Sequence, residues 1–396
     1  MAANPQCDFV GARAPRRALG LIGGAAIAFV MLGAAAQAAL PKVDTMAKQG
    51  IMIDYSTGAV LFEKNADQRM APSSMSKMMT LYILFERIKA GRIKMDDTLA
   101  VSEKAWRTGG SKMFVQVGSR VRVQDLIQGI AVQSGNDACV VVAEGLDGSE
   151  QGFAEEMNKK AKELGLKDSH FVDASGLPDP QQYMTARDLA ILARRLVHDF
   201  PDFYHYFSEI DYMYGNIKQG NRNPLLYKNL NVDGLKTGHT DAGGYGLTAS
   251  ALRNGRRLIL VLNGMASVNE RSRESERLLD WGYREWSNYM LLKAGQQIAD
   301  AEVWLGVQPT VPLVAGEDVV VTVPTAERDA MKVTVSYDGP IPAPIEKGAA
   351  IAQLSVEAPD VPTLAAPLMA GDAVERLGFF GRIGAALHYL LRGQGK

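Results

Sequence analysis

Three short strings of residues occur in order along the chain, and together they carry the groups that acyl transfer through a serine ester requires. They are Ser74-Met75-Ser76-Lys77, Ser134-Gly135-Asn136 and Lys236-Thr237-Gly238. The first supplies a hydroxyl nucleophile with an amine nearby, the second another hydroxyl and an amide, and the third an ammonium beside a glycine. A Ser-x-x-Lys string alone is common by chance, whereas the ordered set of three is specific.

The first string is expected at the start of a buried helix. Pro72 precedes it, and apolar residues recur at helical spacing over residues 78–88. On such a helix the Lys77 amine projects from the same face as the Ser74 hydroxyl and can take its proton. To act as a base the amine must be neutral, which burial or a neighbouring cation such as Lys236 would achieve. The alternative is that Ser74 only caps the helix and Lys77 is solvated.

The second string is expected in a tight turn between two helices. Gly135 permits the turn, so that Ser134 can relay a proton to the leaving group and Asn136 can hold a substrate amide or Lys77. Serine and asparagine are also ordinary helix caps, which is the alternative interpretation.

The third string is expected on a strand at a sheet edge. There Lys236 and Thr237 can donate to a substrate carboxylate, and Gly238 lets a substrate backbone approach closely. The backbone N–H groups of Ser74 and His239 are candidates for an oxyanion hole, while the His239 imidazole is expected to be structural.

The remaining pattern predicts an α+β domain over residues 39–290, with an antiparallel sheet and helices packed on it. Strands are expected at residues 50–54, 59–62, 243–250 and 257–264. Helices are expected at residues 123–133, 137–144, 151–164, 185–198 and 274–289.

Two smaller parts follow this domain. Short β-rich runs separated by glycine and proline predict a small β-sandwich domain over residues 291–366, with Pro359, Pro362 and Pro367 forming a linker near its end. Residues 367–396 are expected to form an amphipathic anchor whose helix starts at Leu377 and lies on a membrane surface. Docking of this helix on the protein's own β domain or on a partner are the alternatives.

The N-terminus is typical of a secretory signal. Arg13, Arg16 and Arg17 precede an uncharged apolar run, which ends at Ala36-Gln37-Ala38. Residues 1–38 are therefore predicted to be a signal peptide, and an uncleaved membrane anchor is the alternative. Either reading places the body of the protein outside the cytoplasm.

Composition excludes several other classes of function. The 43 basic and 44 acidic residues give a net charge of −1, so no overall field favours nucleic acid. After removal of the signal only Cys139 remains, within an apolar run, so a buried thiol and no disulfide are expected. No His, Cys or acidic residues have metal-ligand spacing, so neither a metal nor another cofactor is expected.

The three strings resemble the active-site set of the penicillin-interacting serine enzymes, with Ser-Gly-Asn in place of the usual Ser-Asp-Asn. Their surroundings make the chain similar to the low-molecular-mass penicillin-binding D-alanyl-D-alanine carboxypeptidases, including the β domain and the tail. The stretches that carry this similarity are residues 72–80, 133–138, 171–177, 233–241 and 378–382.

This resemblance implies a β-lactamase/transpeptidase-like fold and a serine carboxypeptidase of the peptidoglycan stem pentapeptide. Ser74 would be acylated by the penultimate D-alanine, Lys77 would be the general base, and water would then hydrolyse the ester. Ser134 and Asn136 would shuttle protons and position the amide. β-Lactams would acylate the same serine, because they mimic the D-alanyl-D-alanine end.

The resemblance also assigns substrate contacts and a location. Lys236 and Thr237 would bind substrate, and Arg273 would face its terminal carboxylate, with a solvated arginine as the alternative. Arg222 would support the Lys236-Thr237 strand. The enzyme would act in the periplasm on the outer face of the cytoplasmic membrane, and its β domain could contact cell-wall-synthesis proteins.

Three rival functions remain open on the sequence. A D,D-endopeptidase would use the same residues, and a class A β-lactamase would need a dedicated glutamate, for which Glu155 is the nearest candidate. A non-catalytic peptidoglycan-binding scaffold would form no penicillin adduct on Ser74.

Overall fold

The computed structural model describes residues 42–359 and 361–384, which fall into two compact units. The first, which we call the peptidase unit, covers Val43–Arg284, and the second begins at Glu285. Within the described residues no helix is both long and apolar enough to span a bilayer. The predicted signal, residues 1–38, lies outside the described residues.

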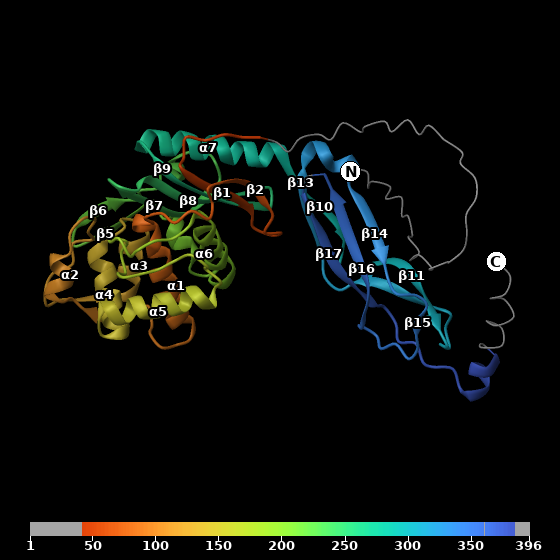
Figure 1. The fold of residues 1–396 in the computed structure, drawn as a ribbon. Coiled ribbons are helices and arrows are strands. Elements are labelled where there is room, and N and C mark those ends of the chain that lie inside the picture. Colours follow the sequence, from red (N-terminus) through yellow and green to blue (C-terminus); the bar gives the residue numbers. More distant parts are fainter. Residues whose placement is uncertain (1–41, 360, 385–396) are drawn as a thin grey trace. The chain divides into compact units, whose positions relative to one another are not determined.

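The peptidase unit is built on a five-stranded antiparallel sheet with the order β2-β1-β9-β8-β7. Its strands are β1 (Gln49–Asp54), β2 (Val60–Lys64), β7 (Val232–Thr240), β8 (Gly244–Arg253) and β9 (Arg256–Met265). Strands β1, β2, β8 and β9 confirm the strands that the sequence predicts at residues 50–54, 59–62, 243–250 and 257–264. All of β1 is buried, because helices cover both faces of the sheet (Figure 1).

Figure 1 shows α7 on one face of this sheet and the remaining helices on the other. The helices are α1 (Lys77–Lys89), α2 (Glu103–Arg107), α3 (Val123–Ala131), α4 (Asn136–Asp147), α5 (Glu150–Glu163), α6 (Ala186–Asp199) and α7 (Val268–Glu285). Alternation along β1 explains the layers, since Ile51 and Ile53 join the core that contains α1, whereas Met52 lies against Gly282 of α7.

Short elements connect these layers. Two-stranded ribbons pair β3 (Thr98–Ala100) with β4 (Arg120–Arg122), and β5 (Asp211–Tyr214) with β6 (Ile217–Gly220). The 3₁₀ turns of this unit are η1 (Ser73–Ser76), η2 (Tyr204–Ser208) and η3 (Pro224–Tyr227).

The second unit is all-β, as expected. A six-stranded sheet of order β14-β16-β17-β12-β11-β15 accompanies the pair β10-β13, and one apolar core joins residues of both sheets. Its elements are β10 (Trp286–Leu292), β11 (Gln297–Trp304), β12 (Thr310–Ala315), β13 (Val319–Pro324), η4 (Thr325–Ala330), β14 (Lys332–Ser336), β15 (Ile341–Pro342), β16 (Ala350–Ala358) and β17 (Val361–Ala370).

Two expected boundaries are wrong. The helix expected at residues 274–289 runs from Val268 to Glu285, so residues 286–290 belong to the β unit as part of β10. Strand β17 instead contains Pro362 and Pro367 of the supposed linker, together with the start of the supposed anchor. Pro362 and Pro367 are tolerated there because β17 pairs with β12 only from Leu368 onward, which leaves one side of the earlier residues free of ladder bonds.

Only the beginning of the expected C-terminal helix lies within the described residues. A helical stretch covers residues 379–384, with Phe379, Phe380 and Ile383 exposed. Residues 385–396 lie outside the described part of the chain, so the amphipathic anchor stays a prediction.

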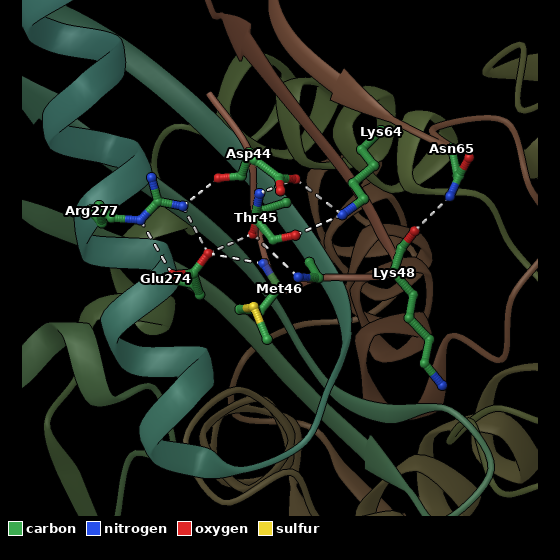
Figure 2. A network of polar contacts seen from close by, with 9 residues as sticks. Asp44, Thr45, Met46, Lys48, Lys64, Asn65, Glu274 and Arg277 are labelled. Carbon is green, nitrogen blue, oxygen red and sulfur yellow. Dashed lines mark hydrogen bonds and ion pairs between the residues drawn. The ribbon is translucent and has the colours of Figure 1, made fainter. Parts of the chain in front are cut away.

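The first described residues are tied to both α7 and β2 by a polar network (Figure 2). The Glu274 carboxylate accepts from Thr45 Oγ1 at 2.7 Å and from Arg277 at 2.9 Å, and Arg277 also donates to the Asp44 carbonyl. Lys64 donates to the carbonyl oxygen of Thr45 at 2.6 Å. The segment that leads into β1 is thereby fixed against the middle of α7.

Replacing Glu274 with alanine is expected to lower the free energy of unfolding by about 1–3 kcal/mol at pH 7, because donors on Thr45, Met46 and Arg277 lose their acceptor. Burial raises the pKa of Glu274, but hydrogen bonds from Arg277 and Thr45 outweigh it and hold the pKa below its ordinary value of 4.5. The stabilisation is therefore fully present above pH 4.5 and is lost as the pH falls through the lowered pKa.

Denaturant unfolding of both proteins between pH 3 and pH 7 would measure this difference. Glu276→Ala is the matched control on the same helix, because Glu276 makes one partly exposed ion pair with Lys228 and should cost less than about 1 kcal/mol. A difference between wild type and Glu274→Ala that stays constant down to pH 3 would refute the assignment.

Candidate active site

The Ser-x-x-Lys string spans the junction between η1 and α1. Ser74 lies in the 3₁₀ turn Ser73–Ser76, and Lys77 is the first residue of the α-helix that follows. Ser74 is half-buried and lines a pocket, whereas the Lys77 side chain is fully buried beneath it. Their side chains meet with Lys77 Nζ 2.8 Å from Ser74 Oγ, so the amine reaches the hydroxyl as predicted.

Two further oxygens contact the Lys77 amine. Asn136 Oδ1 accepts from Nζ at 2.7 Å, and the backbone carbonyl of Ser175 accepts from it as well. The Asn136 amide is oriented by its Nδ2, which donates to the carbonyl of Gly109 at 2.8 Å. The first and second strings therefore converge on one nitrogen.

The second string forms the turn between α3 and α4. Ser134 adopts a left-handed backbone with φ of 67°, and Asn136 is the first residue of α4. The Ser134 hydroxyl is buried at the pocket and has no hydrogen-bond partner among the described residues. It is therefore available to a bound substrate.

The third string lies on β7, an edge strand of the sheet, as predicted. Thr237, Gly238 and His239 line the pocket, and Lys236 is buried with 2% of its surface exposed. A Cβ on Gly238 would lie 3.0 Å from Ser73 Cβ and 3.1 Å from the Pro72 carbonyl, so the glycine also allows η1 to pack closely against β7.

Burial is the main influence on the two lysines. It lowers the pKa of Lys77, and the nearby Arg222 adds to this, while the carboxylates of Asp173 and Asp137 oppose it. Burial lowers the pKa of Lys236 far below its ordinary value, with Lys77 adding to the effect. Both amines therefore lose protons more readily than in water, which a general base requires.

The pocket above these groups has a volume of about 430 Å³, and the charged side chains that line it are all positive. Arg222 and Arg271 supply positive charge, and no acidic side chain is among the described residues that line it. The lining comprises Ser74, Ser111, Ser134, Arg222, Thr237, Gly238, His239, Tyr245, Val268 and Arg271. Such a cavity favours an anionic ligand.

Arg273 is not part of this pocket, contrary to expectation. It lies exposed on α7, whereas Arg271 is 6% exposed and reaches the cavity. Residues two positions apart on a helix point to different sides, so Arg271 and Arg273 cannot both face the pocket. Arg271 shares the buried side of α7 with Ser275 and Leu278. Burial lowers the pKa of Arg271 to about 10, and its Nε has no partner among the described residues.

Three other pocket residues are His239 and Arg222, which the sequence analysis named, and Ser111, which it missed. His239 pairs across the strands with Tyr245, and their rings stack with centroids 3.9 Å apart, which supports the structural role expected for the imidazole. Arg222 donates to Ser111 Oγ at 2.6 Å and so lies at the pocket itself. Ser111 was missed because a serine on a loop has no periodicity that would single it out.

Cys139 lies within α4 as a buried free thiol, and burial raises its pKa to about 12. Across residues 42–359 and 361–384, no group of three His, Cys, Asp or Glu side chains is arranged to hold a metal ion.

Comparison with known proteins identifies the family. The model of the peptidase S11 family, D-alanyl-D-alanine carboxypeptidase, matches residues 34–266, and that of the penicillin-binding protein 5 C-terminal domain matches residues 286–376. The carboxypeptidase DacC of Escherichia coli is 39% identical over 351 residues, covering 87% of each chain. The carboxypeptidase DacA of Haemophilus influenzae is 38% identical over 339 residues, covering 84% of this chain and 86% of its own.

Solved structures agree with this result. Penicillin-binding protein 5 from Haemophilus influenzae superposes with a TM-score of 0.79 at 37% identity, over 85% of this chain and 100% of the other. Ampicillin-bound penicillin-binding protein D2 from Listeria monocytogenes gives a TM-score of 0.57 at 29% identity, over 61% of this chain and 99% of the other. The chain therefore belongs to the D-alanyl-D-alanine carboxypeptidase family of serine peptidases.

Proposed function

We propose that this protein removes the terminal D-alanine from peptidoglycan stem pentapeptides through an acyl-enzyme on Ser74, and that β-lactams acylate the same residue. The observation that carries the proposal is the buried Lys77 amine, 2.8 Å from Ser74 Oγ, beneath a pocket lined with cations. A nucleophile with an adjacent low-pKa base below an anion-binding cavity suits a peptide that ends in a carboxylate.

The reaction uses these groups in two steps. Ser74 Oγ attacks the carbonyl of the penultimate D-alanine while its proton passes to neutral Lys77, and backbone N–H groups stabilise the oxyanion. The C–N bond then breaks, and the leaving amine of D-alanine takes a proton through the Ser134 hydroxyl, which has no partner in the described part of the chain. Water attacks the ester in the second step and releases the tetrapeptide with free Ser74.

Arg271 takes the role that the sequence suggested for Arg273, binding the terminal carboxylate together with Thr237 and Lys236. Its buried guanidinium lines the cavity. The Nε atom of this group has no hydrogen-bond partner among the described residues. A buried arginine is well suited to a carboxylate because its donors form a planar fork.

Replacing Arg271 with alanine is expected to lower kcat/KM for the pentapeptide about 10- to 100-fold, since a charge-assisted hydrogen bond is lost. Arg273→Ala is the matched control and should retain wild-type kinetics, because its side chain points to solvent. Steady-state release of D-alanine from acid-ended and amide-ended peptides would measure the effect. Equal losses in the two variants would refute the assignment to Arg271.

The test of the proposed function is release of free D-alanine from a D-alanyl-D-alanine-ended pentapeptide by the full mature chain, with mass spectrometry of the penicillin adduct. Release together with an adduct mapped to Ser74 supports the carboxypeptidase. An adduct with no release, but with cleavage of cross-linked stem peptides, would favour the endopeptidase. No adduct in the folded protein would favour the scaffold.

A β-lactamase as the main role has less support. Glu155 lies exposed on α5 and accepts from Gln151 at 3.3 Å, and the pocket lining described above contains no glutamate. The proposal therefore includes slow rather than rapid hydrolysis of the penicilloyl ester.

The proposed place of action is the periplasm, at the outer face of the cytoplasmic membrane. The exposed Phe379, Phe380 and Ile383 at the start of the C-terminal helical stretch support binding to a membrane surface. The β domain would offer a surface to cell-wall-synthesis proteins.

A further inference from the structure

The carbonyl of Ser175 is the least expected partner of Lys77, because it is a backbone group on a loop far along the chain. It accepts a hydrogen bond from Lys77 Nζ, 98 residues away in sequence. Beside it, the Ala174 carbonyl accepts from Thr80 Oγ1 at 2.6 Å, one helical turn beyond Lys77. Two successive carbonyls of the loop therefore point at the same face of α1.

The hydrogen-bonding capacity of an amine gives this carbonyl a specific consequence. A protonated lysine has three N–H donors, and Lys77 has three oxygen partners, those of Ser74, Asn136 and Ser175. The neutral amine has two N–H donors and one lone pair. The amide oxygen of Asn136 and the carbonyl of Ser175 can only accept, so they take the two N–H bonds and leave the lone pair facing the Ser74 hydroxyl.

The orientation of the Ser175 carbonyl is set by Asp173. The Asp173 Oδ1 atom accepts from Ser175 N, from Gly176 N at 2.6 Å and from Ser175 Oγ at 2.9 Å. The Gly176 N–H and the Ser175 C=O are opposite ends of one planar peptide unit. That unit is therefore held at one end by the Asp173 carboxylate and at the other by Lys77.

Neighbouring contacts leave this peptide little freedom. Gln182 Oε1 accepts from Val172 N at 2.8 Å and from Asp173 N at 3.0 Å, and these two bonds fix the backbone segment that leads into the turn. Gly176 has φ of +81°, and a Cβ there would lie 1.9 Å from the Ser73 carbonyl oxygen. The turn is thus packed directly under η1, the element that carries Ser74.

We propose that Asp173 is a positioning residue for the acylation step: through the Ser175–Gly176 peptide it holds the carbonyl that aims the lone pair of Lys77 at Ser74. This inference rests on the proposed function, since it concerns the same acylation. Asp173 touches neither the substrate nor the reacting atoms, and its effect reaches them only through the peptide and the amine.

Asp173 also contributes its charge. The charged and titratable groups that act on the Lys77 amine come from several elements, and they are Asp173, Asp137, Cys139, Arg222 and Lys236. The Asp173 carboxylate favours the protonated amine. Removing that charge alone should therefore make Lys77 lose its proton at a lower pH, and the acid limb of acylation should move the same way.

Two substitutions separate the acceptor from the charge. Asp173→Asn keeps an oxygen that accepts from the turn and removes only the charge, whereas Asp173→Ala removes both. Asp179→Ala is the matched control, because Asp179 makes a similar side-chain bond to Gln181 N at 2.7 Å on the same loop but is exposed and does not contact the Ser175–Gly176 peptide.

The experiment measures the second-order rate of acylation by a fluorescent penicillin from pH 5 to pH 10, using the full mature chain and checking folding by thermal unfolding. We expect Asp173→Ala to lower the plateau rate about tenfold or more. Asp173→Asn should recover most of that rate, with its acid limb displaced to lower pH. Asp179→Ala should match the wild type.

Other outcomes overturn the proposal. A wild-type profile in Asp173→Ala would do so, and so would a loss in Asp173→Asn equal to that in Asp173→Ala with an unmoved acid limb, since that pattern means packing alone. If Asp173→Ala fails to fold, the acid limb of Asp173→Asn decides. Absence of any adduct in the folded wild type would overturn the proposed function and this inference together, whereas a normal wild-type adduct with unaffected variants overturns only the positioning role.

Discussion

Alanine in place of Ser74 is expected to abolish both D-alanine release and formation of a covalent penicillin adduct, with a loss of more than about 10⁴-fold in kcat. The reason is that no other hydroxyl can take its place. Ser134 Oγ is at the pocket but has no base bonded to it, and Ser74 Oγ is the only hydroxyl bonded to Lys77 Nζ among the described residues. Release of D-alanine and the intact mass after exposure to penicillin are the two measurements.

The adjacent serine provides the control. Ser76 belongs to the same string, but its hydroxyl donates to the Ser73 carbonyl at 3.0 Å and is fully buried. Ser76→Ala should lose about 1 kcal/mol of stability and keep its adduct. An adduct that persists in Ser74→Ala would mean that another nucleophile reacts, and it would contradict the mechanism.

Replacing Lys77 with methionine is expected to lower the acylation rate about 10²- to 10⁴-fold, the usual contribution of a general base. Methionine fills a similar buried volume without an amine. In the wild type the rate should rise with pH as Lys77 loses its proton, and burial places that rise below the ordinary lysine pKa of 10.5. The variant should show a low rate with this acid limb missing.

Rapid-mixing kinetics with a chromogenic β-lactam across the pH range would record both features. Lys89→Met is the control at the other end of the same helix, where the ammonium donates to the Asp199 carbonyl at the surface. If the acid limb survived unchanged in Lys77→Met, the titrating group would be another residue, and Lys236 would be the first to examine.

The convergence of Ser74, Lys77, Asn136 and Lys236 could be predicted because each belongs to a local pattern with a fixed direction. A hydroxyl and an amine three residues apart at a helix start must share a face, and a turn between two helices must point its side chains outward. These geometric constraints hold whatever the distant parts of the chain do. The chemistry of the site could therefore be predicted from the sequence without knowledge of the three-dimensional structure.

Other features depend on conformations that no residue type specifies. The Ser175 carbonyl is a backbone atom, and its direction follows from a turn that Asp173 and Gln182 hold together. Arg271 could have been preferred to Arg273, because Ser275, Leu278 and Gly282 mark the buried side of α7 and Arg271 falls on it. The assignment of Arg273 came from the family resemblance, whereas the helical period of α7 was the better guide.

The strand β17 shows the limit of composition as a guide. Two prolines and several small residues are typical of a linker, yet residues 361–370 pair along β16. Proline interrupts a ladder only on the side toward which its missing N–H would point, and sequence alone does not tell which side is occupied. The partner strands had to be known first.

The pairing of β1 with β9 determines when the peptidase unit can fold. Gln49 and Asn263 are partners in the sheet although 214 residues separate them. Until residues 256–265 are available, β1 and β2 form only an isolated two-stranded ribbon, which is at best marginally stable in water. The sheet therefore closes in a late, long-range step, and we expect the unit to fold slowly and only after almost all of its chain has been synthesised.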